Sequence, residues 1–163
     1  MISDFAIPTA AELYRSIFRD LLNSKSSRLV QNSSPVHARI IISELIRFAQ
    51  SSVDVFCDSL SPDVWNEQIV CDSVKDAIAR GVSFRVITQH QPKESETKAL
   101  LDSVTKIKTL SNTVDIPNFI IADKCAYRVE IDEEKKIGVA CASGGDVSKT
   151  ISDAFERLYC QVG

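Results

Sequence analysis

The sequence contains few of the residues that build metal, redox and phosphate-loop sites. Its 163 residues include two histidines, five cysteines and five glycines. The cysteines are widely spaced and form no Cys-x-x-Cys pair, which argues against a zinc site. No glycine-rich loop of the kind that cradles a phosphate is present. We therefore expect no bound metal and no cofactor.

Long runs of like charge or of apolar residues are also missing. Nineteen basic and 22 acidic residues give a net charge of −3, without the lysine and arginine stripe that sequence-independent nucleic-acid binding uses. Nucleic acid is possible as a partner but is not indicated. No apolar segment approaches the length of a membrane span, and the N-terminus lacks the pattern of a secretion signal. A cytoplasmic protein without a membrane partner is expected.

A length of 163 residues and a hydrophobic content of 44% suit one domain with a sizeable core. Residues 1–24 are assigned to an N-terminal helix and residues 25–163 to the main domain. Thr9 can cap the helix and Glu12 can complete a capping box. Five apolar residues share one face of this helix and should pack on the domain or on a partner: Leu13, Ile17, Phe18, Leu21 and Leu22.

Strands and helices alternate along the rest of the chain. Strands are predicted at 28–31, 53–60, 82–89, 105–110 and 137–142, and a hairpin at 118–131. Helices are predicted from Pro35 to about residue 50, from about 63 to 80 before Gly81, at 93–104 and at 147–160. The strand, helix and strand order of 53–89 implies a right-handed parallel crossover, and the whole pattern predicts an α/β fold.

The most informative stretch runs from Asp115 to Glu130, with a polar start, an apolar strand, an Asp-Lys turn and a returning strand. It resembles the motif hairpin of the phospholipase D-like superfamily, whose signature is histidine, any residue, lysine, four residues and aspartate. With Asp123 on the aspartate, Ile116 takes the place of the histidine and Asn118 that of the lysine. The resemblance implies a single domain with a mixed sheet flanked by helices.

The two replaced positions bear directly on the family's chemistry, which attacks a phosphodiester with an imidazole and holds its oxygens with lysine. Ile116 offers no nucleophile, and Asn118 offers a hydrogen bond without a charge. Loss of one electrostatic stabiliser costs about 10²–10³ in rate, and loss of a nucleophile about 10⁶ in a well-studied protease. We therefore predict no catalytic residue at this motif.

A cleft is nevertheless predicted where strands end. His90 follows one strand of the predicted parallel pair and Asp58 and Ser59 follow the other, at the edge where open α/β sheets bind ligands. With Asn118, these side chains could converge on one site, although a lone histidine there is more often a surface residue. Asp123 completes the candidate binding set, but a turn aspartate that bonds its own backbone is the preferred interpretation.

These observations favour a protein-interaction or regulatory module, acting as a homodimer or with a different protein partner in a bacterial multi-component system. The family's habit of pairing two motif domains supports the homodimer. One alternative is a phosphodiesterase or nuclease with a site rebuilt around His90. Another is a nucleotide or nucleic-acid sensor that uses the cleft.

Overall fold

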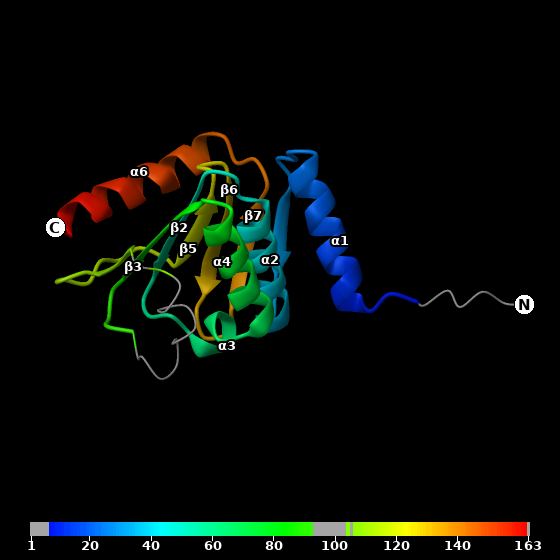
Figure 1. The fold of residues 1–163 in the computed structure, drawn as a ribbon, viewed down its shortest axis with the longest axis horizontal. Helices are drawn as coiled ribbons and strands as arrows, with labels where there is room; N and C mark the ends of the chain where they lie inside the picture. Colours follow the sequence, from blue (N-terminus) through cyan, green and yellow to red (C-terminus); the bar gives the residue numbers. More distant parts are fainter. Residues whose placement is uncertain (1–6, 93–103, 105, 163) are drawn as a thin grey trace, which may run out of the picture.

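A computed structural model describes residues 7–92, 104 and 106–162 of the chain. Its centre is a seven-stranded mixed sheet in the order β1-β7-β6-β5-β2-β3-β4 (Figure 1). The strands are β1 (Leu29–Asn32), β2 (Ser52–Cys57), β3 (Ser83–Thr88), β4 (Lys106–Thr109), β5 (Phe119–Ala122), β6 (Ala126–Asp132) and β7 (Ile137–Cys141). Every strand expected from the sequence is present, with bounds within one or two residues of the prediction except at the end of β2, which stops at Cys57 and not at Leu60.

The sheet has a parallel half and an antiparallel half. β2, β3 and β4 run parallel, which confirms the predicted parallel pairing of the two strands in the 53–89 segment. β5 pairs antiparallel with β2, and β5, β6 and β7 continue as an antiparallel meander that ends on β1. β5 and β6 form the predicted motif hairpin. Asn118, which precedes β5, and Asp123, which follows it, therefore flank opposite ends of one strand.

One helix prediction requires correction. The segment from about 63 to 80 forms two helices, α3 (Pro62–Trp65) and α4 (Gln68–Ala79). The break falls at Glu67, whose backbone is extended with φ −72° and ψ 137°. The chain turns out of α4 at Gly81, whose φ of +86° suits a glycine. The helix predicted at 93–104 lies almost wholly outside the described residues.

Helices cover both faces of the sheet. α2 (Pro35–Phe48) and α4 pack on one face with Val53 and Val55, and α6 (Asp146–Gln161) packs on the other with Phe56. Along β2, Val53, Val55 and Cys57 belong to the core on the α2 side, whereas Asp54 and Phe56 lie on the α6 side, as the two-residue period of a strand requires. None of the helices in the described ranges is both long and apolar enough to cross a membrane.

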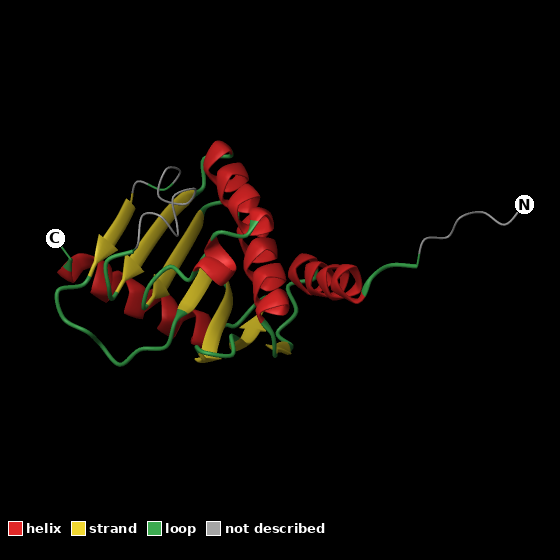
Figure 2. Cartoon of the chain, turned by 90° about the horizontal axis from the view of Figure 1, so that it is seen from below, coloured by secondary structure: helices red, strands yellow, loops and turns green. Residues whose placement is uncertain are grey.

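Helix α1 (Ala10–Asn23) begins with the predicted capping box between Thr9 and Glu12. It lies at the end of the molecule, beside α2 and away from α6 (Figure 2). Only part of the predicted apolar face of α1 is buried, namely the part that packs against the domain beside α2. Phe18 and Leu22 are 1% exposed within the main core, whereas Leu13 and Ile17 are 50% and 60% exposed.

Candidate functional site

His90 and Asp58 form a pair at the carboxyl ends of β3 and β2. Nδ1 of His90 lies 2.8 Å from Oδ1 of Asp58, and the His90 backbone N–H donates to the Asp58 carbonyl at 2.8 Å. The two side chains are 60% and 37% exposed, so the pair lies at the surface. In this arrangement Asp58 fixes the orientation of the imidazole.

Asn118 joins this pair to the interior of the site. Its side-chain oxygen accepts the backbone N–H of Asp58 at 2.9 Å, which places Asn118 at the same end of the sheet. Its amide nitrogen lies 3.5 Å from a carboxylate oxygen of Glu130 on β6. Ser59 and Asn118 line the same small cavity. Asp58, Ser59, His90 and Asn118 thus gather in one region, and ligand binding by them stays a prediction.

The structure does not bring Asp123 to this site. The β2–β5 register runs from Val53 opposite Ala122 to Phe56 opposite Phe119, which puts Asp123 at the far end of the strand pair. The carboxylate there accepts hydrogen bonds from the backbone N–H groups of residues 50, 51 and 52 at 2.7–3.1 Å. Asp123 lies in a turn with a φ of 53°, as the preferred interpretation held, but it bonds the α2–β2 loop and not its own backbone.

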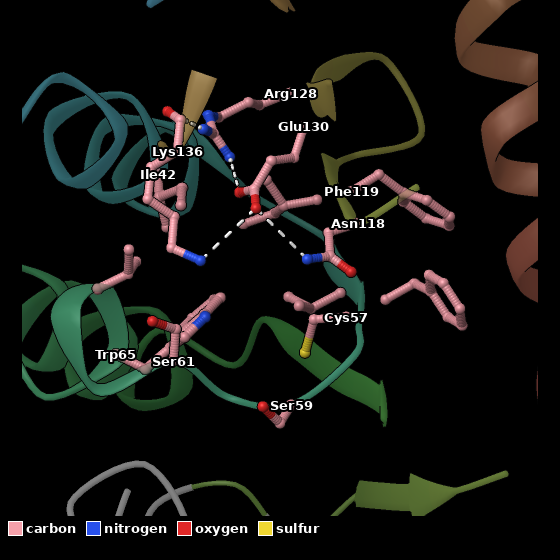
Figure 3. A pocket seen from close by; sticks show the side chains of 14 residues that line it. Ile42, Cys57, Ser59, Ser61, Trp65, Asn118, Phe119, Arg128, Glu130 and Lys136 are labelled. Atoms are coloured by element: carbon pink, nitrogen blue, oxygen red, sulfur yellow. Dashed lines mark hydrogen bonds and ion pairs between the residues drawn. The ribbon is translucent and has the colours of Figure 1, made fainter. Parts of the chain in front are cut away.

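A buried charged cluster that the sequence analysis did not single out lies next to Asn118. Arg128, Glu130 and Lys136 have side chains that are 4%, 8% and 11% exposed. Arg128 Nη1 lies 3.1 Å from Glu130 Oε2, and Lys136 Nζ lies 3.7 Å from Glu130 Oε1 (Figure 3). The sequence contains one signal that could have identified two residues of this cluster. Arg128 and Glu130 are two residues apart in a strand that is otherwise apolar in this stretch, so they share a face of the sheet.

The guanidinium of Arg128 is held in place on several sides. Its Nε donates to the side-chain oxygen of Asn32 at 2.9 Å, and its Nη2 donates to the carbonyl of Lys136 at 3.1 Å. Gly138 leaves room for it, since a Cβ there would lie 2.9 Å from Arg128 Cζ. Burial lowers the pKa of Arg128, an effect that the nearby Glu130 carboxylate opposes. The cluster therefore retains a fixed, buried cation.

Two hollows meet at this cluster. An inner cavity of about 40 Å³ is lined by polar and apolar side chains that include Cys57, Ser59, Ser61 and Trp65 (Figure 3). An outer cleft of about 310 Å³ is lined by three further acidic residues, Asp58, Asp115 and Glu133. Asn118 and Glu130 line both hollows, so they stand at the boundary between them.

The residues around the two hollows limit the chemistry that can take place there. Burial raises the pKa of the Cys57 thiol far above its ordinary value, so the thiol stays protonated and is a poor nucleophile. Ile116 lies on the wall of the outer cleft and packs against the apolar cluster that contains Phe119. Within the described part of the chain, no three His, Cys, Asp or Glu residues are grouped so that they could hold a metal ion.

Neither protein-family models nor curated protein sequences give a match to this chain. Solved structures do. Nuc from Salmonella typhimurium, a phospholipase D family member, has a TM-score of 0.61 at 14% identity over 82% of this chain and 93% of its own. NucT from Helicobacter pylori has a TM-score of 0.60 at 13% identity over 80% and 94%. TrmBL2, an archaeal chromatin protein, has a TM-score of 0.60 at 13% identity over 93% and 60%.

The chain therefore has the phospholipase D-like fold that the motif hairpin predicted. It is one α/β domain with a seven-stranded mixed sheet between helices. The likeness to these structures lies well below the identity at which residue roles carry over, so it concerns the fold alone.

Proposed function

We propose that this protein is a catalytically inactive phospholipase D-like domain that acts as a protein-interaction or regulatory module. The observation that supports this proposal is the set of contacts made by Ile116 and Asn118, the two residues that replace the motif histidine and lysine. Ile116 packs in an apolar cluster, and the Asn118 side-chain oxygen accepts the Asp58 backbone N–H. Neither group supplies a nucleophile or a positive charge to a phosphodiester.

The proposed interaction role is supported by exposed apolar side chains on α1. Leu13 and Ile17 present apolar surface on a helix that is already fixed to the domain through Phe18 and Leu22. Exposed apolar side chains grouped on one helix face favour contact with protein. We propose that the module works in the cytoplasm of a bacterium, as a homodimer or with a different protein of a multi-component system.

A second candidate function is supported by the His90 and Asp58 pair. A carboxylate 2.8 Å from Nδ1 is the arrangement that orients a histidine for general-base or nucleophilic chemistry. A phosphodiesterase or nuclease rebuilt around His90 would use it. The position of His90 is less favourable, because its side chain is 60% exposed and the described residues that line the two hollows do not include it.

Hydrolysis assays separate the two candidates. Purified protein is expected not to hydrolyse bis-p-nitrophenyl phosphate or single-stranded DNA, with a divalent metal or with chelator. His90→Ala is the control variant, since this exposed side chain contributes little to the core. Turnover by the wild type that His90→Ala abolishes would replace the proposal with the rebuilt enzyme.

The interaction role needs its own test. The protein should self-associate at tens of micromolar, or co-purify with a co-expressed product of an adjacent gene, and Ile17→Asp should remove the association. A protein that is monomeric, binds none of these products and does not hydrolyse phosphodiesters would contradict the interaction role.

A further inference from the structure

Three nitrogen donors from different parts of the chain surround the carboxylate of Glu130 (Figure 3). Arg128 lies on the same strand, Lys136 in the turn before β7, and Asn118 just before β5. The backbone of Lys136 is fixed there, because its carbonyl accepts hydrogen bonds from Asn32 at 2.7 Å and from Arg128 at 3.1 Å. Its backbone has a φ of 57°, which is uncommon for a lysine.

The carboxylate does not fill the space between these donors. Charge-assisted N–H···O bonds have lengths of about 2.7–2.9 Å. The contact from Arg128 is 3.1 Å, whereas Glu130 Oε1 lies 3.5 Å from Asn118 Nδ2 and 3.7 Å from Lys136 Nζ. A group with more oxygens, arranged in three dimensions, would contact all three donors better than a flat carboxylate does.

The cluster also has a surplus of positive charge. Arg128 and Lys136 contribute two cations and Glu130 one carboxylate, and all three side chains are at most 11% exposed. Charges that water reaches so poorly are weakly screened, and an unbalanced one is costly. A dianion in place of the Glu130 carboxylate would balance the two cations.

We propose that Glu130 is a built-in occupant of an oxyanion site formed by Arg128, Lys136 and Asn118, and that this site takes a small phosphate group when the carboxylate is displaced. Glu130 borders both hollows, so its side chain can withdraw into the outer cleft. The inner cavity of about 40 Å³ adds space beside the donors. In the resting protein Glu130 closes the site.

The surroundings restrict the ligand to a small one. Asp58, Asp115 and Glu133 line the outer cleft, and their carboxylates repel a polyanionic strand. A single phosphate group, as inorganic phosphate or on a small molecule, places its negative charge next to the three donors and brings little negative charge near the carboxylates of the outer cleft. Hydrolysis is not required for this occupancy, so binding and turnover are separate measurements.

The test is thermal unfolding of Glu130→Ala in inorganic phosphate against sodium chloride of the same ionic strength. Removal of Glu130 leaves two buried cations unbalanced, so the variant should unfold at a lower temperature than the wild type. Phosphate at about a hundred times Kd should raise the midpoint by about 5–10 °C for a chain of this size. The wild type should show no rise beyond that in sodium chloride.

Two double variants identify the donors. Glu130→Ala with Lys136→Met should lose the response to phosphate, whereas Glu130→Ala with Lys135→Met should keep it, because Lys135 is an exposed neighbour outside the cluster. If Glu130→Ala does not fold, Glu130→Gln keeps the shape of the side chain and removes its charge. Calorimetry should then detect phosphate binding by Glu130→Gln that is at least tenfold tighter than by the wild type.

The proposal is overturned if neither Glu130 variant responds to phosphate more than to chloride, or if Lys136→Met leaves the response unchanged. Tighter binding of a single-stranded oligonucleotide than of inorganic phosphate by the same variant would overturn the restriction to small ligands.

Discussion

Asp123 accepts a hydrogen bond of 2.7 Å from the backbone N–H of Ser51, which fastens the β5–β6 turn to the loop that leads into β2. The same carboxylate also accepts the N–H groups of Gln50 and Ser52. The one residue that matches the family signature therefore holds two segments of backbone together. It lies at the opposite end of β5 from the candidate site.

Replacing Asp123 with alanine should destabilise the fold. The change removes the acceptor of three loop N–H groups that are exposed or partly buried, and an intramolecular hydrogen bond contributes about 0.5–1.5 kcal/mol net. Asp123→Asn retains one acceptor oxygen and should cost less than the alanine variant. Urea unfolding measures both. Asp153→Asn on the exposed side of α6 is the control and should change the free energy of unfolding by less than about 0.5 kcal/mol.

The contribution of Asp123 should also depend on pH. Burial raises the pKa of this carboxyl, but the hydrogen bonds from the backbone of residues 50–52 outweigh burial and lower it below its ordinary value. A carboxyl with a lowered pKa in the folded state contributes stability that is complete above its unfolded pKa of about 3.9 and is lost as the pH falls through the folded pKa. The difference in unfolding free energy between wild type and Asp123→Asn should shrink below about pH 4. A difference that stays constant down to pH 2 would contradict this assignment.

Much of the fold could be predicted because its signals are local. The capping box at Thr9, the alternation along β2 and the glycine at residue 81 each report on a few neighbouring residues. The break between α3 and α4 was missed, since no glycine or proline marks the extended backbone of Glu67.

The site was predicted less completely because its contacts are far apart in the sequence. Asn32 and Lys136 are separated by 104 residues, and their hydrogen bond depends on β1 pairing with β7. A single sequence does not specify that register. Asn118 was found because it lies in a motif, whereas Lys136 lies in a charged turn that reads as solvent-exposed.

Arg85 should be essential to the stability of the face covered by α6. Its guanidinium bonds both oxygens of Asp54, at 2.8 and 3.0 Å, and also contacts Glu156. Asp54 has a side chain that is 1% exposed, and burial raises its pKa although Arg85 acts in the opposite direction. Removal of one partner from a buried ion pair costs about 3–5 kcal/mol, because the other charge is left uncompensated.

Arg85→Met is therefore expected to lower the free energy of unfolding by about that amount, whereas Glu156→Gln, at a side chain that is 40% exposed, should cost less than about 1 kcal/mol. In Arg85→Met, Asp54 should be buried in its protonated form. A raised carboxyl pKa gives stability that is greatest at low pH and declines as the pH rises through the window between the unfolded and folded pKa values. Chemical unfolding of the variant at several values from pH 4 to 8 tests this direction.

Ile17 should affect association without affecting the fold. Its side chain is 60% exposed on α1, whereas Phe18, the next residue, is 1% exposed in the core. The two positions provide a matched pair on one helix. Phe18→Ala should reduce the free energy of unfolding by about 3–5 kcal/mol, and Ile17→Asp should change it by less than about 0.5 kcal/mol.

If Leu13 and Ile17 are buried on a second copy of the chain, light scattering of the wild type should give about twice the monomer mass of 18.0 kDa at tens of micromolar. Ile17→Asp places a charge in that apolar contact and should shift the protein to monomer, because an unpaired charge is costly to bury. Circular dichroism and the midpoint of thermal unfolding, extrapolated to low protein concentration, should match the wild type. A wild type that remains monomeric at this concentration would remove the homodimer and leave a different protein as the expected partner of α1.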